Sequence, residues 1–168
     1  MNQEVRTWLA TYFQTTSTYV EETLKDEQAT SYLLIWPIFE QKLFGGFMLK
    51  KNISAAAQTY AQYYHELNAD ASAAHFHNRY QDTTKYRNLK HTDTYAPVDT
   101  ILGKIFSDLS EIEKVELMIY VVYRYRNNIF HGNKGIASWS KYTSEIKLCM
   151  DFMMSLLDCA ERHKGEIT

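Results

Sequence analysis

The sequence predicts an all-α protein, an up-and-down helical bundle of four to five helices in a single domain covering residues 1–168. Two observations lead to this prediction. The 6 glycines and 2 prolines make up about 5% of the chain against an average near 12%, which disfavours a fold of many tight β-hairpins. Apolar residues also recur at helical spacing along most of the sequence. With 45% hydrophobic and 23% charged residues, the composition suits a globular domain with a core.

Two helices are expected in the first part of the chain. Residues 3–14 carry apolar side chains at the i, i+3, i+4, i+7 and i+8 positions of one helical face. The run TTST at 15–18 ends or bends this helix, because these side chains compete for backbone hydrogen bonds or lose χ1 freedom. A second helix is expected over 28–44, with a kink or a fresh start at Pro37 and a break at Gly45-Gly46.

The middle of the chain combines a helical and a polar stretch. Residues 54–80 are expected to be helical, with Ser54 as the N-cap. Residues 81–100 are polar and contain Pro97, which predicts a long loop. A loop of about 20 residues in a compact domain is usually functional or mobile.

The clearest predicted helix covers residues 111–131. Ser110 and Glu113 have the spacing of a capping box, and Gly132-Asn133 is a stop signal. A last helix is expected from about 138 to 162.

Charge and cysteine content narrow the functional classes. A net charge of −2 gives no global basic field, so any contact with nucleic acid must be local. The sequence has no apolar run that could span a membrane and no signal-peptide pattern at MNQEVRTW. Cys149 and Cys159 lie too far apart on one helix for a disulfide. We therefore expect a reduced, cytoplasmic protein with no membrane partner and no zinc signature.

The segment YRYRNNIFHGNK at 123–134 is the candidate for chemistry. On a helix of about 100° per residue, Arg126 falls within the expected buried stripe, where a charge must be paired, lie at an interface or face a wet cavity. Asn127 and His131 are four residues apart and share a face. Arg126 and His131 are about 140° apart, so they converge on one ligand only if the helix unwinds near His131 or a second subunit completes the site.

The string RNNIFH fits the pattern R-x4-H and resembles the HEPN superfamily (higher eukaryote and prokaryote nucleotide-binding domain). The extended form RNNIFHGNK looks like that of bacterial stand-alone members. The stretch YLLIWPIFEQKLF at 32–44 resembles the family's aromatic-rich helix with a glutamate, although Pro37 departs from it. The resemblance covers about 28–160 and leaves 1–27 and 81–100 unmatched.

The resemblance implies an all-α HEPN-like fold and metal-independent RNA cleavage without a cofactor, to 2′,3′-cyclic phosphate and 5′-hydroxyl ends, as in toxins and defence effectors. His131 suits the proton shuttle, Arg126 the developing phosphate charge and Asn127 the orientation of the substrate. Lys134, Arg124 and Asn128 are the expected substrate-binding residues, and Glu40 is a supporting residue. Family members commonly form homodimers, so we expect the 111–131 helices near a twofold axis.

Other functional readings remain open on the same residues. One is a non-catalytic HEPN-like module that binds a nucleotide or a regulatory protein, for example as the partner of a nucleotidyltransferase antitoxin. Another is a purely structural helical interaction protein. In these readings Arg126 forms a buried ion pair with Glu40, His131 caps its helix, and Asn127 and Asn128 are ordinary helix-end residues.

Three further features have simpler interpretations. His75 and His77 lie on different sides of a helix and are expected to be exposed to solvent rather than to bind metal. The basic stretch between Arg79 and His91, interleaved with tyrosines, predicts a solvated loop, with guidance of RNA as the alternative. The methionines of the last helix are expected to pack in the core or against other helices; these are Met150, Met153 and Met154.

Overall fold

The computed structural model describes residues 2–12, 14–25, 27–130 and 140–166. The described residues form ten α-helices and contain no strand, which confirms the all-α class with more helices than the four to five expected. The α-helices are α1 (Gln3–Tyr12), α2 (Ser17–Leu24), α3 (Glu27–Phe44), α4 (Ile53–Ala61), α5 (Tyr64–Leu67), α6 (Asp70–Arg79), α7 (Thr83–Lys90), α8 (Ala96–Leu102), α9 (Glu111–Phe130) and α10 (Thr143–Arg162). Within the described ranges, no helix combines the length and the apolar character that a membrane span requires.

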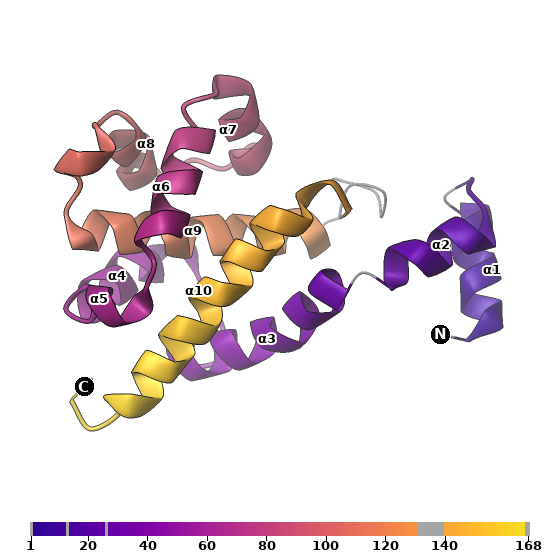
Figure 1. Cartoon of the computed structure of the whole chain (residues 1–168), viewed down its shortest axis with the longest axis horizontal. Coiled ribbons are helices and arrows are strands. Elements are labelled where there is room, and N and C mark those ends of the chain that lie inside the picture. The colour runs from indigo at the N-terminus through magenta and orange to yellow at the C-terminus, as the bar shows by residue number, and fades with distance from the viewer. Residues whose placement is uncertain (1, 13, 26, 131–139, 167–168) are drawn as a thin grey trace.

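Helix α9 lies at the centre of the body, with α4, α6, α7, α8 and α10 packed around it (Figure 1). All eight residues from Val115 to Val122 are buried. The helix is therefore covered on every side along this segment, where the sequence suggested a single apolar stripe. Glu116 is buried among them, and its Oε1 accepts hydrogen bonds from the hydroxyls of Ser54 and Tyr95. Burial, followed by the hydrogen bond to Glu116, raises the pKa of Tyr95 to about 12.

Helix α10 packs along α3 on one side of the body (Figure 1). α3 runs through Pro37 as one helix. It ends at the expected break, where Gly45 and Gly46 have φ angles of 66° and 98°. The amide of Gly46 donates to the carbonyl of Glu40 at 3.1 Å, so this turn is hydrogen-bonded back to the C-terminal end of α3.

The hairpin of α1 and α2 stands away from the body, at the N-terminal end of α3 (Figure 1). Among its described side chains, the hairpin buries Ala10 and Val20. Trp8 and Tyr12 stack on each other, with ring centroids 5.1 Å apart, yet remain 59% and 67% exposed. Because both rings are mostly exposed, the hairpin presents an uncovered apolar face. Helices this short are marginal when they stand alone in water.

The stretch 54–80 is helical but divided into α4, α5 and α6. Asn68 ends α5 in the left-handed conformation, with φ 47°, which stops a helix. Ser54 is not the N-cap of α4. That position belongs to Asn52, and the hydroxyl of Ser54 instead donates to Glu116.

The prediction of a loop over 81–100 is wrong, because α7 and most of α8 lie there. Asp82 caps α7, and its Oδ1 accepts from the amides of Thr84 and Lys85 at 2.9 and 3.1 Å. Pro97 lies in the first turn of α8, where a missing N–H costs nothing. The sequence carries two helix-start signals here, the Asp82 cap and Pro97, which the polar composition outweighed in the prediction of a loop.

The capping box at the start of α9 and most of the expected core of α10 are confirmed, whereas the stop signal Gly132-Asn133 and the start expected near residue 138 lie outside the described residues. The amide of Ser110 donates to Glu113 at 3.0 Å, and the amide of Glu113 donates back to the hydroxyl of Ser110 at 3.3 Å. Both cysteines are free and buried. Met150 and Met153 are buried, whereas Met154 is 43% exposed, so only two of the three methionines pack in the core.

Candidate functional site

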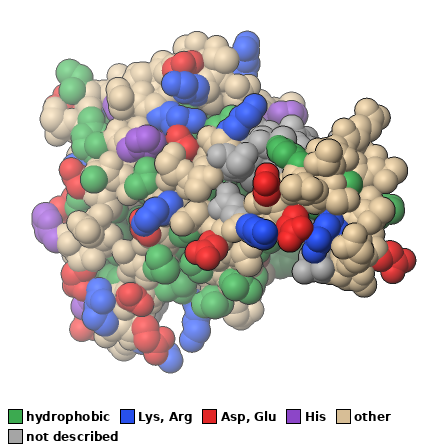
Figure 2. Space-filling view, turned by 45° about the vertical axis from the view of Figure 1, so that its right-hand side comes forward, with side chains coloured by type: hydrophobic (Ala, Val, Ile, Leu, Met, Phe, Trp, Pro, Cys, Tyr) green, Lys and Arg blue, Asp and Glu red, His purple; other side chains and the backbone are tan. Residues whose placement is uncertain are grey.

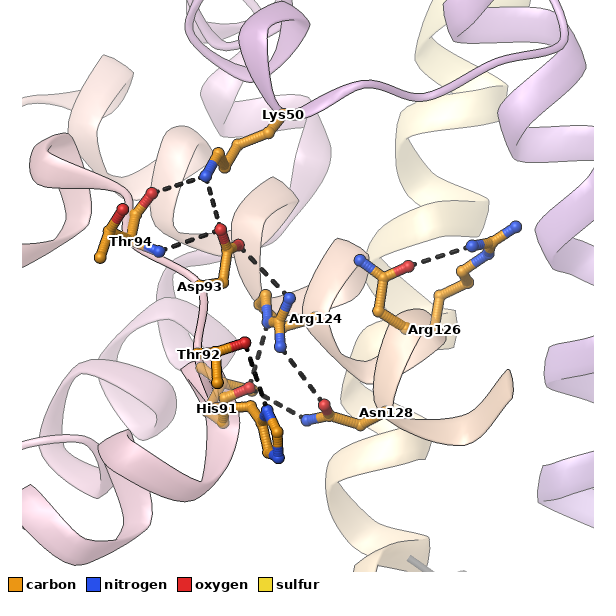
Figure 3. A network of polar contacts seen from close by, with 10 residues as sticks. Lys50, His91, Thr92, Asp93, Thr94, Arg124, Arg126 and Asn128 are labelled. Carbon is orange, nitrogen blue, oxygen red and sulfur yellow. Dashed lines mark hydrogen bonds and ion pairs between the residues drawn. The ribbon is translucent and has the colours of Figure 1, made fainter. Parts of the chain in front are cut away.

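The predicted site residues lie in the last two turns of α9 and beside it on α3. Arg124, Arg126, Asn127, Asn128 and Glu40 belong to the described part of the chain. His131 and Lys134 lie outside the described residues, so their roles stay predictions. The described residues divide into two groups on different sides of α9, and Figure 3 shows Arg126 pointing away from Arg124 and Asn128.

The first group joins Arg126 to Asn127 and α3. Nη1 of Arg126 donates to Oδ1 of Asn127 at 3.0 Å, and the guanidinium carbon lies 5.5 Å from the ring centroid of Trp36. Asn127 is buried and Arg126 half-buried. A cation over an indole face is attracted by the ring quadrupole, so Trp36 helps to hold the guanidinium at this end of α9.

Glu40 supports this group indirectly. Its Oε2 accepts from the indole N–H of Trp36 at 3.1 Å, and its Oε1 accepts from the amide of Met48 at 3.1 Å. Both Glu40 and Arg126 are described, and their side chains form no ion pair, so the direct pairing suggested as the structural alternative does not occur. Glu40 instead fixes the indole that contacts Arg126.

The second group ties α9 to the end of α7 and the turn that follows it (Figure 3). Nε of Arg124 donates to the carbonyl of Leu89 at 3.1 Å, and Nη1 donates to Oδ2 of Asp93 at 3.3 Å. Nδ2 of Asn128 donates to the same Leu89 carbonyl at 3.0 Å, while its Oδ1 accepts from Nη2 of Arg124 at 3.4 Å. Lys50 also donates to Asp93.

This network provides hydrogen bonds to the carbonyl of Leu89, which the last turn of α7 leaves without a helical partner. Arg124 and Asn128 are 7% and 8% exposed. Their polar groups are largely engaged inside the protein, which assigns them a part in docking α7 onto α9 in addition to their predicted contact with substrate.

A small cavity of about 60 Å³ lies beside Asn128, where α6, α7, α9 and α10 meet. Its walls are mainly aromatic and aliphatic, from Tyr80, Leu89, Tyr125, Ile129, Tyr142 and Ile146. Its polar lining comes from Arg79, Lys85, Asn88 and Asn128. Sequence reasoning missed this cavity, because it assigned the residues of α7 to a loop.

Internal ion pairs account for part of the basic stretch. Nη1 of Arg79 lies 2.7 Å from Oε1 of the buried Glu145, and Nζ of Lys90 lies 3.6 Å from Oδ1 of Asp99. Burial raises the pKa of Tyr80 and Tyr125, so both hydroxyls are protonated at neutral pH. The stretch is therefore largely helical rather than a loop, although Lys85, Arg87 and His91 are exposed to solvent, as the sequence suggested.

The prediction for the histidines of α6 is half right. The side chain of His75 is 42% exposed, but His77 is buried, with its ring centroid 5.5 Å from that of Phe106. His77 lies on the inner face of α6, near Ala73 and Phe76, which are fully buried. The neighbouring apolar residues, rather than its own polarity, decide its position.

Comparison with protein-family models, with curated proteins and with solved structures found no match to this chain. The likeness to the HEPN superfamily therefore depends on the sequence alone, on the R-x4-H string and the aromatic-rich stretch 32–44.

Proposed function

We propose that this protein is a metal-independent endoribonuclease of the HEPN type that acts in the cytoplasm as a toxin or phage-defence effector. The observation that carries the proposal is the arrangement of Arg126. Asn127 accepts its hydrogen bond, Trp36 lies against its guanidinium, and His131 follows five residues later in the sequence. A cation with a fixed direction at the end of a helix suits a developing negative charge.

The proposed reaction transfers a phosphoryl group within the RNA. The 2′-oxygen attacks the adjacent phosphorus, the bond from phosphorus to the 5′-oxygen breaks, and the products carry a 2′,3′-cyclic phosphate and a 5′-hydroxyl. His131 moves protons between these oxygens, Arg126 stabilises the charge on the phosphorane, and Lys134 contacts the phosphate. Asn127 orients Arg126, which makes it a positioning residue in this proposal.

One observation favours a second candidate, the non-catalytic binding module. Arg124 and Asn128 form hydrogen bonds with α7 and Asp93 inside the protein, and the cavity beside Asn128 has mostly apolar walls, which suit binding more than phosphate chemistry. A module of this kind uses the same end of α9 to hold a nucleotide or a regulatory protein such as a nucleotidyltransferase antitoxin.

We also propose that the active form is a homodimer, with its contact away from the middle of α9. The segment 115–122 is covered by its own chain, so α9 has no free apolar stripe there. Uncovered apolar side chains lie instead on α1 and on the outer face of α3, where Leu34 and Ile38 are 68% and 54% exposed. Figure 2 shows hydrophobic surface along the lower edge of the body, where α3 lies in Figure 1.

We propose that a second copy of this chain covers both surfaces. A groove of about 430 Å³ lies between the C-terminal halves of α3 and α10. Its apolar lining comes from Ile38, Tyr60, Leu157 and Ala160, and its charged lining from Lys42, Asp158, Glu161 and Lys164. The hairpin projects from the opposite end of α3, and Ile38 lies 11 residues beyond Glu27, which corresponds to about 16 Å along the helix. If two α3 helices pack antiparallel about Leu34 and Ile38, each hairpin reaches the other copy's groove, and one twofold axis closes both contacts.

The area involved is sufficient for a specific dimer. Trp8 and Tyr12 have large exposed fractions, and an aromatic side chain buries about 150–250 Å² when covered. Each hairpin thus hides roughly 250 Å², and two hairpins with two grooves hide about 1,000 Å², near the lower bound of specific interfaces.

Cleavage of labelled RNA by the purified protein in EDTA tests the proposed activity. We expect cleavage to survive chelation and to fall about 10²–10⁴-fold in His131→Ala, because a positioned acid or base contributes that much. His65→Ala is the matched control, since its side chain is 91% exposed. Wild-type cleavage by His131→Ala would favour the binding module. Loss of activity in EDTA that Mg²⁺ or Mn²⁺ restores would refute the metal-independent mechanism.

A further inference from the structure

Metal-ligating side chains meet where α5 packs against the C-terminal end of α10. The ligand atoms of Glu66, Cys159 and His163 all lie within 4.8 Å of one another. Cys159 and His163 are four residues apart on α10, so their side chains share one face of that helix. Glu66 comes from α5, 97 residues before His163. Helix packing, rather than a local sequence motif, therefore builds the group.

The distances suit a tetrahedral ion. Nε2 of His163 lies 3.1 Å from Oε1 and 3.3 Å from Oε2 of Glu66. Two ligands held at about 2.0–2.1 Å from a tetrahedral zinc are about 3.3 Å apart. A thiolate, an imidazole and a carboxylate form a ligand set that zinc accepts, whereas Ca²⁺ and Mg²⁺ prefer oxygen ligands alone.

The second nitrogen of His163 is held as in known zinc sites. Its Nδ1 lies 3.2 Å from Oε2 of Glu166, and the ring of Tyr63 stacks on the imidazole with centroids 4.0 Å apart. The hydroxyl of Tyr63 also donates to Glu166 at 3.2 Å. In the structure Nε2 of His163 is hydrogen-bonded to Glu66; an ion would replace that proton, and the carboxylate of Glu166 would keep the remaining proton on Nδ1, so that Nε2 would be the ligating atom.

Glu66 divides its two oxygens in a similar way. Its Oε2 accepts from Nη2 and Nε of Arg162 at 2.9 and 3.2 Å, whereas Oε1 faces Nε2 of His163 at 3.1 Å and is the oxygen that an ion would contact together with that nitrogen. The same Arg162 brings a positive charge close to the site. It weakens the attraction for a cation but keeps the carboxylate ionised, and the pKa of Glu66 is lowered by its hydrogen bonds from His163 and Arg162.

We propose that Oε1 of Glu66, Sγ of Cys159 and Nε2 of His163 bind a zinc ion that joins α5 to α10, with water as the fourth ligand. Burial raises the pKa of the Cys159 thiol, so the thiol is protonated in the metal-free protein and zinc binding releases its proton. The competing reading is an ion-pair cluster of Glu66, Arg162 and His163 that needs no metal.

This site is independent of the proposed cleavage. Cys159 lies 16 residues beyond Thr143, the first residue of α10, which corresponds to about 24 Å along the helix. The end of α9 meets the opposite end of α10 at the cavity beside Tyr142. Removing zinc should therefore lower stability without changing RNA cleavage at temperatures well below the melting point.

Titration of the chelator-stripped protein with Co²⁺, followed by Zn²⁺, tests the site. We expect one equivalent of Co²⁺ to give a cobalt–thiolate charge-transfer band, which one equivalent of Zn²⁺ abolishes. Zinc at about 100 times its Kd should raise the melting temperature by about 5–10 °C. Glu166→Gln should weaken binding about 10–100-fold, as loss of an outer hydrogen bond to a ligating histidine does.

Two cysteine variants separate a metal site from an ion-pair cluster. Cys159→Ser should lose the band and the zinc-dependent shift, whereas Cys149→Ser, which alters the other buried thiol of α10, should keep both. Glu66→Ala changes an exposed side chain and removes a ligand if Cys159→Ser fails to fold. Absence of the band in the wild-type protein, or an unchanged band in Cys159→Ser, would overturn the proposal.

Discussion

Asn127 and Asn128 are adjacent residues of the same type, yet the structure gives them different partners. Asn128 links Arg124 to the Leu89 carbonyl inside the protein. Asn128→Ala removes one neutral hydrogen bond and one from a charged donor, worth about 2–3 kcal/mol together when buried. The Leu89 carbonyl keeps its bond from Nε of Arg124 at 3.1 Å, which moves the expected loss to about 2 kcal/mol, or about 4–8 °C in melting temperature.

Asn127→Ala should have the opposite profile. The half-buried Arg126 can replace the lost hydrogen bond with water, so we expect a stability loss near 1 kcal/mol and a shift of about 2–4 °C. The guanidinium then loses its fixed direction, and a misplaced catalytic group can cost about 100-fold in rate.

Thermal unfolding by circular dichroism and cleavage of a fluorogenic RNA, measured on both variants well below their melting points, separate these effects. We expect Asn128→Ala to lose more stability than Asn127→Ala, and Asn127→Ala to lose more of the cleavage rate than Asn128→Ala. Equal rates in the two variants would refute the positioning role of Asn127. A wild-type melting temperature for Asn128→Ala would refute the role of Asn128 in holding α7.

Two further predictions concern the support of Arg126 and the dimer. Glu40→Gln should lower stability by about 1–2 kcal/mol, because the amide nitrogen cannot accept one of the two hydrogen bonds from Trp36 and Met48, and cleavage should fall only in part. Glu22→Gln is the control and should change neither stability nor cleavage. An unchanged melting temperature in Glu40→Gln would contradict the role of Glu40. Light scattering should give a dimer of twice 19.7 kDa. Trp8→Ser or Leu34→Glu should dissociate this dimer, whereas Ile105→Ser, which changes another exposed position, should not. A wild-type monomer at micromolar concentration would refute the contact.

Elements with strong local signals were predictable from the sequence. The capping box at Ser110 and Glu113 and the pair Gly45-Gly46 mark the start of α9 and the end of α3, because each depends on residues close together in the chain. The loop predicted over 81–100 failed for the opposite reason. The side chains of α7 are mostly polar, so it lacks a strong apolar period, and its helix depends on the Asp82 cap and on docking through Leu89.

The candidate site was predictable in its directions but not in its partners. A helical wheel places Arg126 and Asn128 on nearly opposite sides of α9, as the structure does. The wheel cannot show that Trp36 faces one side and the end of α7 the other. Glu66 and Cys159 show the same limit more strongly, because only the packing of α5 on α10 brings their ligand atoms together.

The contact between Arg126 and Trp36 bears on why a charge is tolerated in the apolar stripe of α9. A buried ion pair would require full desolvation of both charges, and removing either partner would then cost about 3–5 kcal/mol. The indole face attracts the guanidinium without adding a second charge, and the half-buried position leaves part of Arg126 in contact with solvent. Glu40 contributes through the indole N–H, one residue further from Arg126. Trp36 and Glu40 together thus contribute to the stability of this end of α9, and the hydrogen bond to Asn127 contributes to the direction of the cation.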